Sequence, residues 1–259
     1  MSNQRIIFFD IDGTLLDSNK QLPDSTKRSI EQLKRDGHIV AIATGRAPFM
    51  FHDLLQELEL DTYVSYNGQY VVLKNEVIFT NPLQMDSLVD LTKEALDRKH
   101  PVVFMDHEDM KANVPEHPYI DESFLTLKIK QHPTYDPHYY QGRNLYQSLL
   151  FCEEGEEVYY ENKYKDFHFI RWHPLSVDIV PSDGSKAVGI SKMIDLLNID
   201  PANVYAFGDG LNDMDMLENV ENSIAMGNAL DEVKAKAKYI TKSVDEEGIY
   251  HGLKAFGLL

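Results

Sequence analysis

The chain has 259 residues, of which 43% are hydrophobic, and carries a formal net charge of −17 at pH 7. Because a single hydrophobic core typically serves about 100–150 residues, we expect two domains or one domain with a large insertion. The negative charge excludes nucleic acid and anionic membrane surfaces as partners, since both would be repelled.

The N-terminal residues show no pattern of a signal peptide or of a transmembrane helix, because the first apolar run begins at Ile6 and is short. The single cysteine, Cys152, cannot form an internal disulfide, which argues against a secreted disulfide framework. We therefore expect a cytoplasmic protein, and no pattern points to an obligate protein partner.

The first predicted strand, 6–9, ends in two carboxylates, Asp10 and Asp12, followed by Gly13 and Thr14. Aspartate is a poor strand former, and an ionised carboxylate near a core is costly unless a cation or hydrogen bonds compensate it. Because residues two apart point to the same side of a strand, both carboxylates can address one point beyond its end. This arrangement suits Mg²⁺ and a phosphoryl group, with one aspartate as nucleophile and the other as proton shuttle.

The next segments alternate between helix and strand. The second strand is followed by the polar stretch 44–46, and the third is followed by Asn67 and Gly68. Alternation of helices with continuously apolar strands predicts a parallel sheet covered by helices on both faces. The predicted elements are helices at 25–36 and 48–58 and strands at 39–43 and 63–66.

Residues 83–181 break this alternation, contain seven of the ten histidines and are punctuated by prolines. A helix is predicted at 85–98, and short antiparallel strands are predicted at 125–130 and within 167–180, the latter as a hairpin. We interpret 83–181 as an α+β domain inserted into a core domain that consists of 1–82 and 182–259.

The helix and strand alternation resumes after Gly184. The fourth apolar strand, 204–207, is followed by a second acidic stretch that contains Asp209 and Asp213. The other predicted elements are helices at 186–197, 229–237 and 245–256 and short strands near 223–226 and 239–240.

Ligands of open parallel sheets bind beyond the carboxyl ends of the strands, so residues about two hundred positions apart can converge on one pocket. Four carboxylates and one divalent cation need a further positive charge if a phosphate is also to bind, and Lys186 can supply it. The Thr44 hydroxyl and nearby backbone N–H groups can hold phosphate oxygens. Asn212 can orient either the ion or the phosphate.

The motifs Asp10-x-Asp12-Gly13-Thr14, Thr44-Gly45-Arg46, Lys186 and Gly208-Asp209-Gly210-x-Asn212-Asp213 occur in this order. Together they resemble the four motifs of the haloacid dehalogenase (HAD) superfamily. The long α+β insertion between the second and third motifs is similar to the class IIB cap of the Cof-type subfamily. The resemblance spans nearly the whole chain, and it implies an α/β fold with a Rossmann-like parallel-sheet core and an inserted α+β cap that acts as a lid.

The resemblance also implies roles for single residues. Asp10 would attack phosphorus, and Asp12 would act as general acid and then as general base. Mg²⁺ would be held by Asp10, the backbone carbonyl of Asp12, Asp209 and Asp213. The implied phosphate-binding residues are Ile11, Thr44, Gly45, Lys186 and Asn212, and the candidate substrate contacts are Arg46, Asn67 and Gly68.

The implied activity is Mg²⁺-dependent hydrolysis of phosphate monoesters of small metabolites, such as sugar phosphates, nucleotides or phosphorylated cofactors, through an aspartyl-phosphate. A phosphomutase acting on hexose phosphates is an alternative with the same motifs. A receiver-type signalling protein that stores a phosphoaspartate is a second alternative, but it would need neither Asp12 nor the large insertion. The sequence does not identify the substrate or the oligomeric state.

Overall fold

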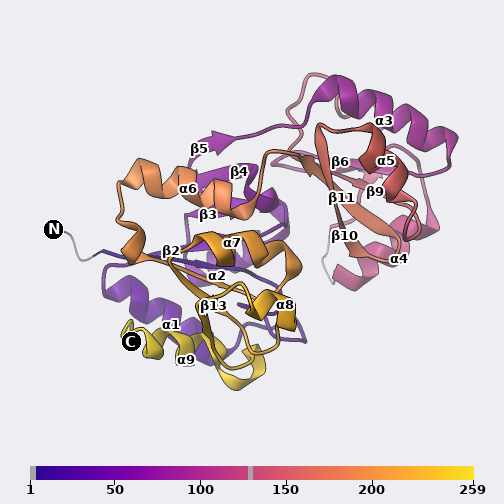
Figure 1. Cartoon of the computed structure of the whole chain (residues 1–259). Helices are drawn as coiled ribbons and strands as arrows, with labels where there is room; N and C mark the ends of the chain where they lie inside the picture. Colours follow the sequence, from indigo (N-terminus) through magenta and orange to yellow (C-terminus); the bar gives the residue numbers. More distant parts are fainter. Residues whose placement is uncertain (1–3, 128–130) are drawn as a thin grey trace. The chain divides into compact units, whose positions relative to one another are not determined.

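A computed structural model describes residues 4–127 and 131–259. The chain forms two compact units (Figure 1). The core unit consists of Met1–Gly45, His52–Phe79 and Ser185–Leu259, and the inserted unit consists of Arg46–Phe51 and Thr80–Gly184. Within the described residues, no helix combines the length and the apolar character needed to cross a lipid bilayer.

The core unit contains an eight-stranded sheet in the order β14-β13-β12-β1-β2-β3-β4-β5. The six strands from β14 to β3 run parallel to their neighbours, whereas β4 is antiparallel to β3. Strand β1 therefore lies between β2 and β12, in the middle of the parallel part. The strands are β1 (Ile6–Phe9), β2 (Ile39–Ala43), β3 (Tyr63–Ser65), β4 (Tyr70–Leu73), β5 (Glu76–Thr80), β12 (Val204–Gly208), β13 (Asn222–Ala225) and β14 (Tyr239–Ile240).

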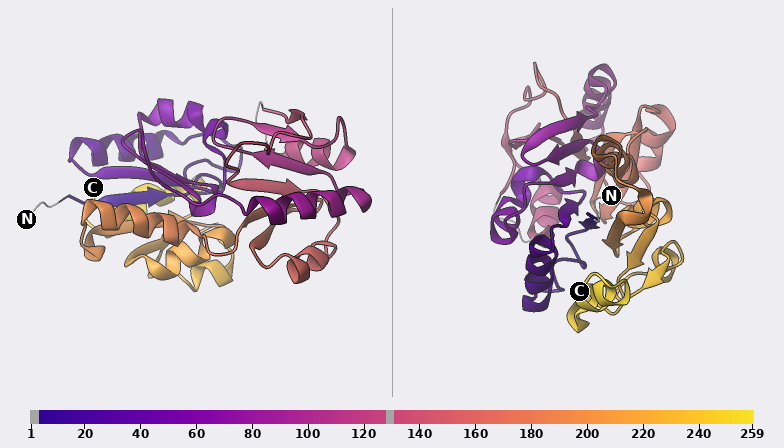
Figure 2. Two further views of the ribbon diagram at one scale, coloured as in Figure 1. Left: turned by 90° about the horizontal axis from the view of Figure 1, so that it is seen from above. Right: turned by 90° about the vertical axis from the view of Figure 1, so that its left-hand side faces the viewer.

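Helices cover both faces of this sheet, as the two further views show (Figure 2). Helices α1, α2 and α9 lie on one face, and α6 and α7 lie on the other. The helices are α1 (Asp24–Arg35), α2 (His52–Leu58), α6 (Lys186–Leu197), α7 (Met214–Asn219), α8 (Asp231–Lys234) and α9 (Gly248–Ala255), with short turns of 3₁₀ helix at η2 (Tyr66–Gly68), η3 (Pro201–Asn203), η4 (Leu211–Asp213) and η5 (Val244–Glu246).

Strand β1 is apolar at every position because both of its faces are covered. Ile6 and Phe8 belong to the cluster under α6 and α7, which includes Ile190 of α6. Phe9 points to the opposite face and stacks on Phe207 of β12 with 4.9 Å between the ring centroids. All four β1 side chains are fully buried, so the strand gives the residues that follow it a rigid support.

The inserted unit contains a six-stranded sheet in the order β10-β11-β9-β6-β7-β8. Its strand pairs are antiparallel except for β7 and β8. Residues of α3 and α5 join the strands in one apolar cluster. The elements are η1 (Pro48–Met50), α3 (Met85–Asp97), β6 (Val102–Met105), β7 (Met110–Ala112), α4 (Pro118–Leu127), β8 (Thr134–Tyr135), β9 (Gln147–Leu150), α5 (Glu157–Lys163), β10 (Phe167–His173) and β11 (Ser176–Pro181).

The strand predicted at 125–130 is wrong where the structure describes it. Residues 125–127 end α4, and 128–130 lie outside the described residues. The burial of Ile120, Ser123 and Phe124 follows a helical spacing of three to four residues, and Leu125 is 78% exposed. The predicted helix at 48–58 is interrupted at Phe51, between η1 and α2.

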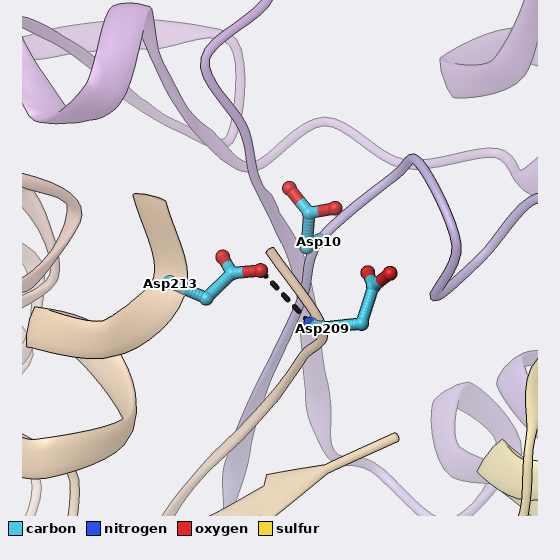
Figure 3. Close-up of side chains that lie close together, drawn as sticks. All are labelled: Asp10, Asp209 and Asp213. Atoms are coloured by element: carbon cyan, nitrogen blue, oxygen red, sulfur yellow. Dashed lines mark hydrogen bonds between the residues drawn. The ribbon is translucent and has the colours of Figure 1, made fainter. Parts of the chain in front are cut away.

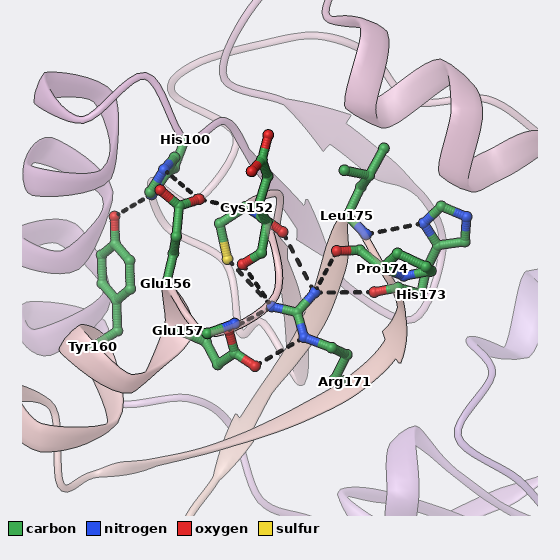
Figure 4. A network of polar contacts seen from close by, with 11 residues as sticks. His100, Cys152, Glu156, Glu157, Tyr160, Arg171, His173, Pro174 and Leu175 are labelled. Carbon is green, nitrogen blue, oxygen red and sulfur yellow. Dashed lines mark hydrogen bonds and ion pairs between the residues drawn. The ribbon is translucent and has the colours of Figure 1, made fainter.

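Arg171 ties the β10–β11 hairpin to the segment that leads into α5 (Figure 4). Its guanidinium binds the Glu157 carboxylate through two hydrogen bonds, from Nε at 2.8 Å and from Nη2 at 2.5 Å. It also donates to the backbone carbonyls of Glu153, His173 and Pro174. The side chains of Arg171 and Glu157 are only 19% and 13% exposed, so this planar, multidentate contact lies largely out of water.

We predict that Arg171→Gln lowers the free energy of unfolding by about 3 kcal/mol, because it leaves a mostly buried carboxylate without its partner. The matched control is Lys93→Gln, which removes one positive charge from the exposed Lys93–Asp90 pair of the same unit and should cost about 0.5 kcal/mol or less. Denaturant unfolding of both variants checks the prediction, and equal losses would contradict it.

Candidate active site

A buried ammonium group joins two of the predicted site residues. Lys186, the first residue of α6, donates from Nζ to Asp10 Oδ1 at 2.6 Å and to Asp213 Oδ1 at 2.7 Å. The Lys186 and Asp213 side chains are fully buried, and the Asp10 side chain is 8% exposed. Residues from three distant parts of the chain therefore meet at the carboxyl end of the core sheet.

The loop after β12 fixes the direction of Asp213. Its Oδ2 accepts the backbone N–H groups of Asp209 and Gly210, each at 2.9 Å, while Oδ1 faces Lys186. Figure 3 shows the bond to the Asp209 amide and the three carboxylates of Asp10, Asp209 and Asp213 gathered around one space. The Asp213 carboxylate thus links the loop after β12 to Lys186.

Asp209 is held by residues of two other loops. Its Oδ1 accepts from the Thr14 hydroxyl at 2.9 Å, and its Oδ2 accepts from Asn228 Nδ2 at 3.0 Å. Asn228 also donates to the carbonyl of Gly13 at 2.9 Å. Gly13 has a φ of +82°, and a Cβ there would lie 2.1 Å from Asp209 Oδ2. Both the backbone conformation and the lack of space for a side chain therefore require glycine at this position.

The start of α6 is placed by a second close backbone approach. A Cβ on Gly68, whose φ is +98°, would lie 1.9 Å from the carbonyl oxygen of Ser185, the N-cap of α6. Asn67 donates its backbone N–H to the Thr44 carbonyl, and its Oδ1 accepts from Asn212 Nδ2 at 3.2 Å. The loops after β2, β3 and β12 are therefore connected next to Lys186.

Burial and mutual repulsion raise the pKa values of the carboxyl groups. Burial is the main cause of the rise in the Asp10 pKa to about 8; the Asp213 charge adds to it, and Lys186 only partly opposes it. Burial and the Asp213 charge raise the pKa of Asp209 to about 6. Burial lowers the pKa of Lys186, but Asp10 and Asp213 outweigh it and raise this pKa, which keeps the ammonium charged.

The carboxylates of Asp10, Asp209 and Asp213 fit a divalent cation. Each offers one oxygen atom, and the three oxygens lie within 4.8 Å of one another. The donors are all hard oxygens, which are the ligands that Mg²⁺ and Ca²⁺ prefer. Burial raises the pKa values of Asp10 and Asp209 most, and the neighbouring carboxylates add to the rise. A bound cation would oppose both effects by stabilising the ionised carboxylates.

The other predicted site residues differ in their burial and in the unit to which they belong. Ile11 and Thr44 are buried at the ends of β1 and β2, and Asp12 is partly exposed on the loop after β1. Gly45 faces Asn67, since a Cβ there would lie 3.0 Å from the Asn67 amide group. Arg46 falls in the segment of the inserted unit, and its role as a substrate contact stays a prediction.

Sequence reasoning gave no role to Thr14 and missed Asn228, although both hold Asp209. The sequence did contain a signal for Asn228, because this polar residue comes shortly after the predicted strand near 223–226, as Asp10 and Asp209 come after theirs. The reasoning also missed Lys20, which pairs with Asp12. No pattern in the sequence points to that pair, since it depends on the turn between the two residues.

The comparisons with known proteins agree with this geometry. A family model described as haloacid dehalogenase-like hydrolase matches residues 7–253. YkrA of Bacillus subtilis (strain 168) is 47% identical over 257 residues, which cover 99% of each chain. A crystal structure of a Geobacillus kaustophilus HTA426 protein is 52% identical, with a TM-score of 0.94 and coverage of 99% of this chain and 100% of that one.

The structure of the HAD subclass IIB sugar phosphatase BT4131 is 28% identical, with a TM-score of 0.87. The match covers 98% of this chain and 100% of that one, so it includes the inserted unit as well as the core unit.

We predict that, without divalent cations, the contribution of Asp10 and Asp209 to the stability of the chain falls as the pH rises from about 4 to about 8. The native state holds protons on Asp10 and Asp209, with pKa values of about 8 and about 6, that the unfolded chain has already released. The native state therefore binds more protons in this window, and stability decreases with pH. A cation replaces these protons, so Mg²⁺ should raise the melting temperature more at about pH 8 than at about pH 5.

Thermal melts of wild type and Asp209→Asn, with Mg²⁺ and with EDTA, check this prediction. The control variant Asp231→Asn removes a fully exposed carboxylate and should keep the Mg²⁺ response of wild type. A Mg²⁺ shift of equal size at both pH values, or one that survives Asp209→Asn, would contradict the cation site.

Proposed function

The chain belongs to the haloacid dehalogenase-like hydrolase family as one of its Cof-type, class IIB phosphatases, and on this premise we propose that it hydrolyses phosphate monoesters of small metabolites through an aspartyl-phosphate on Asp10. The observation that carries the proposal is the Lys186 ammonium, which bonds to Asp10 and Asp213 in a buried cluster of acids. Membership of this family argues against the alternative that the chain is a receiver-type signalling protein.

Asp10 is the best candidate for the nucleophile because β1 aims it and Lys186 holds one of its oxygens. An oxygen of the Asp10 carboxylate forms a bond to phosphorus while the bond from phosphorus to the leaving oxygen breaks. The leaving oxygen takes a proton from the Asp12 carboxyl group, and the product alcohol departs. Asp213 does not suit this part, since its side chain is fully buried and its carboxylate holds the amides of its own loop and Lys186.

The second step returns the enzyme to its starting state. A water oxygen attacks phosphorus and gives a proton to the Asp12 carboxylate, and the bond from phosphorus to the Asp10 oxygen breaks. Inorganic phosphate leaves, Asp10 is again a carboxylate and Asp12 is again protonated. Asp12 suits this exchange because its side chain is partly exposed, whereas that of Asp10 is buried. Asp209 is also partly exposed, but it is held by Thr14 and Asn228.

Mg²⁺ is the proposed cofactor, held by Asp10, Asp209, Asp213 and the Asp12 carbonyl, and it would supply positive charge against the developing negative charge of the transferring phosphoryl group. Lys186 contributes the second positive charge and positions Asp10. The proposed phosphate ligands are the Thr44 hydroxyl, the backbone of Ile11 and Gly45, and Asn212, which its bond to Asn67 directs.

We also propose that the inserted unit is the lid that chooses among substrates. The support is that a sugar phosphatase of subclass IIB matches the chain over both units. Sugar phosphates are therefore the first substrates to test, followed by nucleotides and phosphorylated cofactors.

We predict that Asp10→Asn abolishes phosphate release, with a loss of at least about 10³-fold, because an amide is a poor nucleophile. Asp12→Asn should lower the rate by about 10²-fold to 10⁴-fold, since it removes the general acid and base. The measurement is phosphate release from a panel of phosphorylated metabolites, with Mg²⁺ and with EDTA, and Asp231→Asn serves as the folded, active control.

An Asp10→Asn variant that stays folded and hydrolyses at the wild-type rate would refute the assignment of the nucleophile. Isomerisation of a hexose phosphate without phosphate release would instead establish the phosphomutase.

A further inference from the structure

Lys20 forms an ion pair with the proposed general acid. Its Nζ lies 2.5 Å from Asp12 Oδ1, and the two side chains are 31% and 37% exposed. Lys20 lies eight residues after Asp12, on the far side of a loop that folds back onto itself. The loop is closed by a backbone bridge between Asp12 and Leu16, and Leu16 donates its N–H to the Ile11 carbonyl at 2.8 Å.

A tight turn organised by Asp17 holds Lys20 in this place. The Asp17 carboxylate accepts the backbone N–H groups of Asn19 and Gln21, each at 2.8 Å. The Lys20 N–H donates to the Asp17 carbonyl, and the Asp17 N–H donates to the Gln21 carbonyl, both at 2.9 Å. Each side of the turn is thus hydrogen-bonded, so the position of the Lys20 backbone is well determined.

Lys20 has a φ of +62°, in the left-handed region that favours glycine. A side chain in this region is tolerated only when the surrounding structure determines the backbone, and such residues concentrate at functional sites. A glycine at this position would relieve the strain but would lack the ammonium group. Eight other non-glycine residues of the described chain, Lys74 among them, also have a positive φ, so it is the ion pair with Asp12 that distinguishes Lys20.

We propose that Lys20 is a positioning residue that holds the Asp12 carboxyl group in the orientation needed to exchange protons with the leaving oxygen and with water. This inference rests on the proposed function, in which Asp12 is the general acid and base. The ammonium donates to Asp12 Oδ1 and thereby restricts rotation of the carboxyl group. Proton transfer is sensitive to such geometry, because donor and acceptor must lie within hydrogen-bond distance.

The ordinary alternative is that the pair is a surface ion pair with no effect on catalysis, since many partly exposed pairs contribute little. A positioning role and a surface ion pair predict different activities for a Lys20 variant on substrates with good and with poor leaving groups. A leaving group that departs easily needs little protonation, whereas a poor leaving group depends on the acid. Loss of positioning should therefore reduce activity most with poor leaving groups, while a general structural defect should reduce it equally with all.

The experiment measures kcat/KM for a series of substituted phenyl phosphates whose phenols span a range of pKa values, from p-nitrophenyl phosphate to phenyl phosphate. This ratio includes the departure of the leaving group in the first step. For Lys20→Met we expect a loss of about tenfold with phenyl phosphate and of less than about threefold with p-nitrophenyl phosphate. Asp12→Asn should show the same trend with larger losses, and Lys20→Arg should restore most of the activity because arginine can keep the ion pair.

The matched control is Lys74→Met, since Lys74 is an exposed lysine of the core unit that, like Lys20, has a positive φ, here of 51°. It should behave as wild type across the series. Lys20→Gly keeps the left-handed backbone without the ammonium, so it gives the same readout if Lys20→Met does not fold.

Two failures can be told apart. A wild type that hydrolyses none of the phenyl phosphates or metabolite phosphates overturns the proposed function and the inference with it. A wild type that hydrolyses the series, combined with a Lys20→Met variant that is unchanged or loses the same factor with every phenol, overturns the inference alone.

Discussion

The site depends on one buried ammonium placed between two buried carboxylates. Lys186 contacts Asp10 and Asp213 at 2.6 and 2.7 Å, where solvent cannot screen any of the three charges. An unpaired charge at this depth would cost several kcal/mol, about 3–5 when one partner of a buried pair is removed. When both carboxylates are ionised, they carry more negative charge than the ammonium neutralises, so a bound cation favours the ionised form of Asp10. The two acids differ in their other contacts, because Asp213 also accepts the backbone N–H groups of its own loop.

The rest of the core unit brings these groups together from distant parts of the chain. The central position of β1 lets its end meet the ends of β2 and β12, and the full burial of its side chains makes this support rigid. Two glycines then allow approaches that no other residue permits, Gly13 against Asp209 and Gly68 against the start of α6. Close approach of backbone segments therefore brings the few charged side chains of the site together.

The sequence predicted the parts that depend on local pattern. Apolar strands followed by polar residues identified Asp10, Asp209 and Asp213, whose meeting the structure describes, and the helix predicted at 186–197 agrees with α6. The pattern failed where the spacing was ambiguous, as at 125–127, and it did not reveal strands such as β6 and β9, which lie in the inserted unit. The contacts of Asn228 and Lys20 could not be predicted, because they arise from loop conformations rather than from periodicity.

Chemical trapping of the aspartyl-phosphate tests directly whether Asp10 is the nucleophile. Enzyme mixed with a substrate and Mg²⁺ is quenched in acid and reduced with borohydride, which converts an aspartyl-phosphate to homoserine, and the modified residue is located by mass spectrometry. We expect homoserine at position 10 and at no other aspartate. Rapid turnover without modification of Asp10, or modification at Asp209 or Asp213, would contradict it.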